Sequence, residues 1–113
     1  MAYEKQVKLL GDQRLFELNP AVKKYTLRDI GFVESKNGRF VLERPLDVNA
    51  GFNNSFKLKM AISSDLRTFK LTTTSANGLQ EVNLFKKNDS QLLEQLDYVL
   101  HQLIERKVIQ LIS

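Results

Sequence analysis

The sequence of 113 residues contains no cysteine, no tryptophan and one histidine. Without cysteine the chain forms no disulfide bonds, and one histidine cannot supply the ligands of a structural zinc site. The apolar runs are far shorter than the roughly twenty residues that cross a bilayer. Residues 1–6 also lack the apolar stretch of a secretory signal. We therefore expect a cytoplasmic protein with no membrane segment and no metal.

The sequence also lacks a recognisable catalytic set. Its five glycines are too widely spaced for a nucleotide-binding loop, so we predict no cofactor. His101 lies four residues from both Asp97 and Glu105, a spacing typical of one solvated helix face. The alternative, an acid-base or metal site at His101, has no nucleophile nearby in sequence. These absences favour a protein that is not an enzyme by itself.

The composition is that of a globular protein, with 42% apolar residues and a formal net charge of +4. The length and the absence of repeats or linkers predict a single domain over residues 1–113. The basic residues occur in scattered pairs, which are typical of a solvated surface. Charge alone therefore does not favour a nucleic-acid partner.

Turn signals divide the first 85 residues into strand-like segments. Gly11 predicts a hairpin between residues 6–10 and 13–18. Asn37-Gly38 predicts a type I′ hairpin between residues 30–36 and 39–43. Asn77-Gly78 predicts a second type I′ turn, which leads into a strand over residues 79–85. Asn19-Pro20 predicts a helical turn over 21–24, and residues 47–54 have the composition of an irregular loop.

The clearest strand spans residues 56–62. Its alternation places Leu58, Met60 and Ile62 on one face with Phe56, and Lys57 and Lys59 on the other. The threonine-rich segment 68–75 predicts a neighbouring strand.

The apolar period changes to about 3.6 residues after residue 87. Asn88, Asp89 and Ser90 are all suitable N-caps, and Asn88 with Gln91 resembles a capping box. One apolar stripe at helical spacing follows, which comprises Leu92, Leu93, Leu96, Val99, Leu100, Leu103 and Ile104. Residues 108–112 predict a final short strand. The predicted fold is α+β, in which antiparallel β hairpins, forming one or two sheets, pack against a single main C-terminal helix.

The predicted sheet offers two candidate binding surfaces. Lys57, Lys59 and Lys70 share its outward side with Thr72 and Thr74, a composition that suits an anion or a nucleic-acid backbone. Phe56 and Phe69 fall on the buried side, so the sheet lacks the aromatic platforms of RNA-binding sheets. An ordinary solvated face is the simpler interpretation.

The second candidate is a small-ligand site. Thr72, Thr74 and Asn77 offer polar groups around one turn, and Arg28 with Asp29 offers charges beside an apolar run. A pocket bordered by both groups would suit an amino acid or a related metabolite. A protein-interaction module, with a partner enzyme or a second copy at an exposed strand, is a further alternative.

Four segments carry a resemblance to a known family: KLLGD at 8–12, VKKYTLRDIGF at 22–32, FKLKM at 56–60 and TSANGL at 74–79. Over nearly the whole chain the sequence resembles a small family of unknown function from lactic acid bacteria, whose assigned theme is amino-acid metabolism. The resemblance implies an α+β fold with two sheets against one helix. It also implies an accessory or small-ligand-binding role in amino-acid metabolism.

That family is similar in turn to prokaryotic S-adenosylmethionine decarboxylases, which cut themselves before a serine and use nearby His and Cys. Glu34-Ser35 resembles such a cleavage dipeptide. However, the chain has no cysteine, and His101 is distant in sequence. We therefore expect any relationship to concern the fold and not the chemistry.

Overall fold

The computed structural model describes residues 3–47 and 54–112, so most of the predicted loop over 47–54 lies outside the described residues. Two antiparallel sheets are present, with strand orders β1-β2-β7 and β3-β4-β5-β6. The elements are β1 (Gln6–Val7), β2 (Phe16–Leu18), α1 (Lys24–Ile30), β3 (Val33–Glu34), β4 (Phe40–Pro45), β5 (Lys57–Ile62), β6 (Phe69–Thr74), the 3-10 helix η2 (Leu84–Lys87), α2 (Ser90–Glu105) and β7 (Ile109–Leu111). The predicted α+β fold is confirmed, with two sheets.

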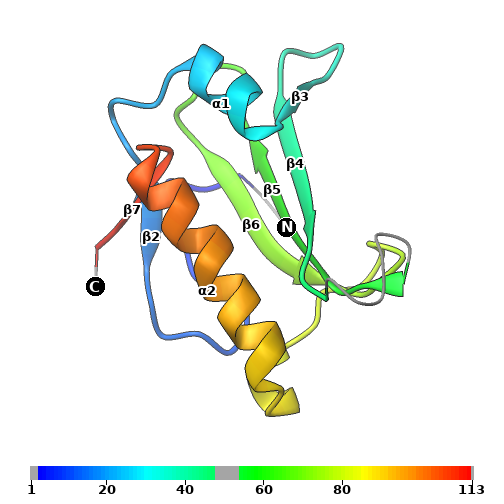
Figure 1. Cartoon of the computed structure of the whole chain (residues 1–113). Coiled ribbons are helices and arrows are strands. Elements are labelled where there is room, and N and C mark those ends of the chain that lie inside the picture. The colour runs from blue at the N-terminus through cyan, green and yellow to red at the C-terminus, as the bar shows by residue number, and fades with distance from the viewer. Residues whose placement is uncertain (1–2, 48–53, 113) are drawn as a thin grey trace.

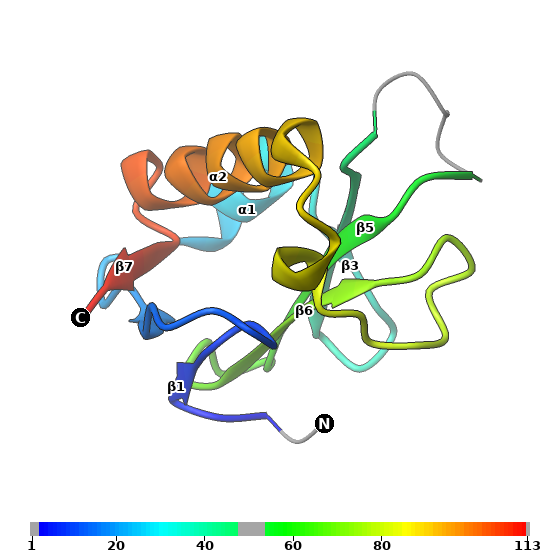
Figure 2. The ribbon, with the colours of Figure 1, turned by 90° about the horizontal axis from the view of Figure 1, so that it is seen from below.

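The two helices lie on one side of the sheets. Figure 1 shows α2 running diagonally between β2 and β7 on one side and the four-stranded sheet on the other. Seen from below, α1 and α2 lie together, with β1, β6 and β7 beneath them and β5 to one side (Figure 2). The opposite side of the four-stranded sheet is therefore not covered by a helix.

Strand register places one apolar side of the four-stranded sheet toward the helices. Met60 pairs with Leu42 and Leu71, and Ile62 pairs with Phe40 and Phe69. All six of these side chains are at most 4% exposed. The predicted alternation in β5 is thus confirmed for Leu58, Met60 and Ile62, and the apolar layer of β4, β5 and β6 contributes to the protein core.

Helix α2 covers this layer with its apolar stripe, from which Leu92, Leu96, Val99, Leu100 and Leu103 are buried. Its N-cap is Asp89, whose Oδ1 accepts hydrogen bonds from the backbone N–H groups of Gln91 and Leu92 at 3.1 and 3.3 Å. The predicted capping box is wrong, because Asn88 adopts a left-handed conformation that ends η2. None of the described helices is both long enough and apolar enough to span a bilayer.

The segment between the two sheets differs from the prediction. The helix spans Lys24–Ile30 instead of residues 21–24, so residue 30 belongs to a helix and not to a strand. No side chain caps its start at Lys23, and the buried side chain of Leu27 anchors it to the core. Gly31, at φ 121°, ends the helix by donating its N–H to the carbonyls of Leu27 and Arg28.

The chain turns at both predicted Asn-Gly positions, with a turn geometry that differs from the prediction. Gly38 and Gly78 have φ of 80° and 75°, whereas Asn37 and Asn77 are not among the described residues with positive φ. Both turns therefore contain one left-handed glycine, and not the two left-handed residues of a type I′ turn. The predicted strand over 79–85 is also wrong: Glu81 makes one bridge to Thr74, and η2 follows.

Candidate functional site

The uncovered side of the four-stranded sheet carries an open hollow of about 480 Å³, which we call the sheet hollow. Strands β4, β5 and β6 form its floor, and the segment after β6 forms one wall. Its lining residues are Val41, Glu43, Lys59, Ala61, Lys70, Thr72, Thr74, Gly78 and Glu81. The predicted outward side of the sheet is therefore concave.

Strand register arranges this hollow in rows. Glu43, Lys59 and Thr72 are cross-strand neighbours in the middle row. Val41 and Ala61 are neighbours in the next row, beside Lys70. The floor therefore combines an apolar patch with side chains of both charge signs.

The charged groups of the sheet hollow are not paired with one another. Among the described residues, Glu43, Lys59, Lys70 and Glu81 take part in no ion pair and no side-chain hydrogen bond. The ammonium of Lys70 lies 4.6 Å from the ring centroid of Tyr3, which orients this lysine without neutralising it. Glu43 Oε2 reaches the wall, where a methyl group added at Gly78 would lie 3.9 Å away. Charges of both signs are thus available to a ligand.

Lys57 does not belong to the exposed surface. The side chain points to the same side of the sheet as Lys59, but it is only 4% exposed and its Nζ donates to the carbonyl of Ala76. The turn after β6 folds over it, held by a hydrogen bond from the Ser75 N–H to the Gln80 carbonyl. The predicted exposure of Lys57 beside Lys59 is therefore wrong.

The polar residues around the turn after β6 have distinct positions. Thr72 and Thr74 both line the sheet hollow, although Thr74 is 5% exposed and donates its hydroxyl to the Ser75 carbonyl. Asn77 Oδ1 accepts from the Leu79 N–H and from Ser75 Oγ, at 3.0 and 2.6 Å. The Asn77 side chain therefore shapes the turn.

Arg28 and Asp29 lie elsewhere, on α1. Arg28 Nη2 forms an ion pair with Glu34 Oε1 at 2.6 Å. Asp29 lies 4.0 Å from Arg106 and lines a separate hollow beside α2. The structure thus brings Thr72 and Thr74 together and places Asp29 in a different hollow.

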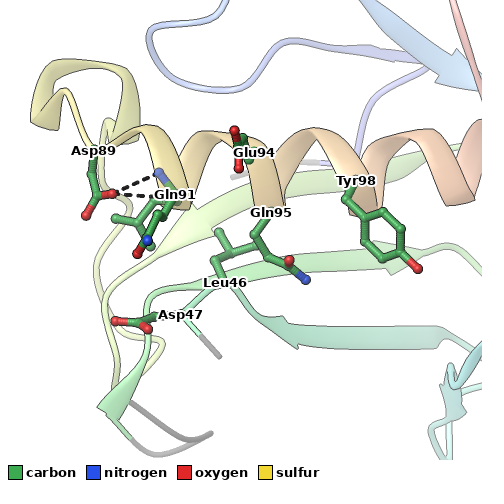
Figure 3. Close-up of a pocket in the computed structure, with 8 residues that line it drawn as sticks. Leu46, Asp47, Asp89, Gln91, Glu94, Gln95 and Tyr98 are labelled. Atoms are coloured by element: carbon green, nitrogen blue, oxygen red, sulfur yellow. Dashed lines mark hydrogen bonds between the residues drawn. The ribbon is translucent and has the colours of Figure 1, made fainter. Parts of the chain in front are cut away.

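A further pocket, of about 380 Å³, lies beside the first turns of α2 and has no counterpart in the sequence predictions. Figure 3 shows Leu46 and Asp47 on one side of it and Asp89, Gln95 and Tyr98 on the helix side. The Asp89 carboxylate already caps the helix. The pocket depends on the end of β4 approaching α2, a long-range contact that no local pattern reveals.

His101 lies on the exposed side of α2, in a shallow hollow that Asp97 and Glu105 also line. This confirms the predicted common face of the three residues. Among residues 3–47 and 54–112, no group of three or more His, Asp or Glu side chains is arranged to hold a metal ion.

Comparison with known proteins gives the family. The model of the DUF1831 family, described as "Putative amino acid metabolism", matches residues 1–110. The chain belongs to this family. The crystal structure of a DUF1831 family protein from Lactobacillus plantarum is 45% identical to this chain, covers 99% of both chains and has a TM-score of 0.90. The comparison with curated proteins gave no match. The resemblance to a family from lactic acid bacteria is thus confirmed for this DUF1831 chain. The family description names amino-acid metabolism in general and gives no specific function.

Proposed function

We propose that this DUF1831 protein binds a free amino acid in the sheet hollow. The observation that carries the proposal is the set of unpaired charges of both signs, Lys59 and Lys70 with Glu43 and Glu81, around one concave surface. An amino acid carries a carboxylate and an ammonium group close together. A surface with both positive and negative side chains is electrostatically more complementary to such a zwitterion than to a ligand with a charge of one sign.

The lining residues suggest an orientation for this ligand. Lys59 and the hydroxyl of Thr72 are neighbours in register, so together they donate charge-assisted hydrogen bonds to the ligand carboxylate. Glu43, on the other side of Lys59, accepts from the ligand ammonium. The apolar floor at Val41 and Ala61 is then left for an aliphatic side chain. The family theme of amino-acid metabolism supports the same ligand class.

The alternative of a nucleic-acid or general anion surface is less well supported. Burial of Lys57 removes one of the three predicted cations. Glu43 and Glu81 line the same hollow as Lys59 and Lys70, so the local charge balances. Phe69 is fully buried and offers no stacking platform.

The proposal is tested by thermal unfolding in the presence of each common amino acid, followed by calorimetric titration of the best ligand. A ligand at about one hundred times its Kd stabilises the folded protein by about 2.7 kcal/mol. Lys59→Met and Glu43→Gln each remove one charge of the sheet hollow and should weaken binding at least tenfold. Lys36→Met and Glu94→Gln make the same changes at exposed positions outside it and should bind normally.

Three outcomes would contradict the proposal. One is the absence of any amino acid that shifts the unfolding temperature. Another is unchanged affinity in both Lys59→Met and Glu43→Gln. The third is tight, salt-dependent binding of an oligonucleotide that competes with the amino acid, which would support the alternative surface.

A further inference from the structure

Arg44 occupies a position where the fold calls for an apolar residue. Along β4 and just beyond it, Phe40, Leu42 and Leu46 alternate toward the helices and are at most 4% exposed. Arg44 falls in the same alternation, and its cross-strand neighbour Leu58 is 1% exposed. A guanidinium group in such a column is costly unless it is solvated or bound.

The guanidinium of Arg44 has no partner among the residues that the structure describes. Within the described part of the chain, Arg44 forms no ion pair and no hydrogen bond, although it is half-buried. It lines a hollow of about 250 Å³ between the end of α1 and the last turn of α2, which we call the helix hollow. A guanidinium has five donors in a planar fork, a geometry that matches a carboxylate. The unused donors of Arg44 are therefore available to a ligand in this hollow.

A second guanidinium lines the same hollow. Arg106 lies there with Asp29, Glu105 and Gln102. Its ion pair with Asp29 has an N–O distance of 4.0 Å, and the two side chains are 50% and 65% exposed. Such an exposed, long ion pair is weak, so Arg106 can exchange it for an interaction with a ligand at little cost in free energy. The carboxylates of Asp29 and Glu105 oppose a second negative charge on that ligand.

We propose that the helix hollow binds the carboxylate of a small monocarboxylic acid between Arg44 and Arg106. The two rim carboxylates make it select a singly charged acid over a doubly charged phosphate. This site shares no lining residue with the sheet hollow and does not depend on the proposed amino-acid site.

The experiment follows the Nε–Hε signals of Arg44 and Arg106 by NMR while acetate or propionate replaces chloride at constant ionic strength. We expect saturable shifts of both signals with either acid, and at least fivefold weaker binding of inorganic phosphate at a pH where most of the phosphate carries two negative charges. The variants are Arg44→Met and Arg44→Lys, with Arg67→Met as the matched control at an exposed turn. Arg44→Met should fold, because methionine suits the apolar column between Leu42 and Leu46.

In Arg44→Met the shifts of Arg106 should disappear, and in Arg44→Lys the affinity should fall at least threefold because the planar fork is lost. Arg67→Met should bind as the unmodified protein does. The proposal is overturned if chloride alone produces the same shifts, if phosphate binds more tightly than acetate, or if Arg44→Met retains the Arg106 response. Full binding by Arg44→Lys would also overturn the assignment of a guanidinium fork.

Discussion

Replacing Gly11 with alanine tests how the first hairpin is joined to the rest of the fold. Gly11 has φ of 84°, and a β-carbon there would lie only 2.5 Å from Asn83 Cγ. Asn83 Oδ1 accepts the Phe85 N–H at 3.0 Å and so caps η2. Alanine in the left-handed region costs about 1 kcal/mol, and displacing the cap costs about 1 kcal/mol more. We expect Gly11→Ala to lower the free energy of unfolding by about 2 kcal/mol.

The assay is chemical and thermal unfolding followed by circular dichroism. A loss of about 2 kcal/mol corresponds to roughly 8 °C in Tm for a domain of this size. Gly38→Ala is the control, because its φ of 80° carries the same conformational cost while its nearest contact, Ser64 Cβ, is at 3.3 Å. We expect about 1 kcal/mol for this control.

A double-mutant cycle isolates the contact with Asn83. Asn83→Ala alone should cost about 1 kcal/mol, the value of the lost cap. In the Gly11→Ala background the same change should cost nothing, since the cap is already displaced. If Asn83→Ala still costs about 1 kcal/mol in that background, alanine at position 11 does not displace the Asn83 cap.

Three further predictions concern charge, capping and packing. Ser63 Oγ donates to Asp65 Oδ1 and, with the Arg67 N–H, holds the pKa of the Asp65 carboxyl below its usual value of 3.8. The ionised carboxylate therefore contributes its full stabilisation of the fold above that pH, and this contribution is lost as pH falls through the lowered pKa. NMR titration of Ser63→Ala should show a rise in the pKa of Asp65. Asp89→Ala should cost about 1 kcal/mol in urea unfolding, whereas Asn88→Gly should cost nothing. Leu96→Ala, at a fully buried position, should cost about 3 kcal/mol in the same assay.

The parts of the fold that were predicted correctly are those in which a local period is set by burial. Alternation in β5 and the apolar stripe of α2 both result from one side facing the same core. Helix α1 was misplaced because its start has no capping side chain and its stability comes from Leu27 inserting into a core that is formed by distant strands. The prediction of a strand over 79–85 is wrong because Asn83 caps a 3-10 helix that occupies Leu84–Lys87.

The candidate sites were less predictable than the fold. Alternation correctly placed Lys57 on the outward side of β5, yet it could not show that the turn after β6 folds over the side chain. Glu81 was missed because its approach to the sheet depends on one bridge with Thr74. The role of Arg44 also required the strand register, which shows that its neighbours across and along the strand are core residues.

NMR titration of the protein with an amino acid that binds it locates the ligand through the backbone amide chemical shifts. If the amino acid binds in the sheet hollow, the largest shifts fall on Lys59, Thr72 and Gly78, on the side of the four-stranded sheet that no helix covers. Shifts concentrated instead on Gln95 and Tyr98, beside the first turns of α2, would contradict binding in the sheet hollow.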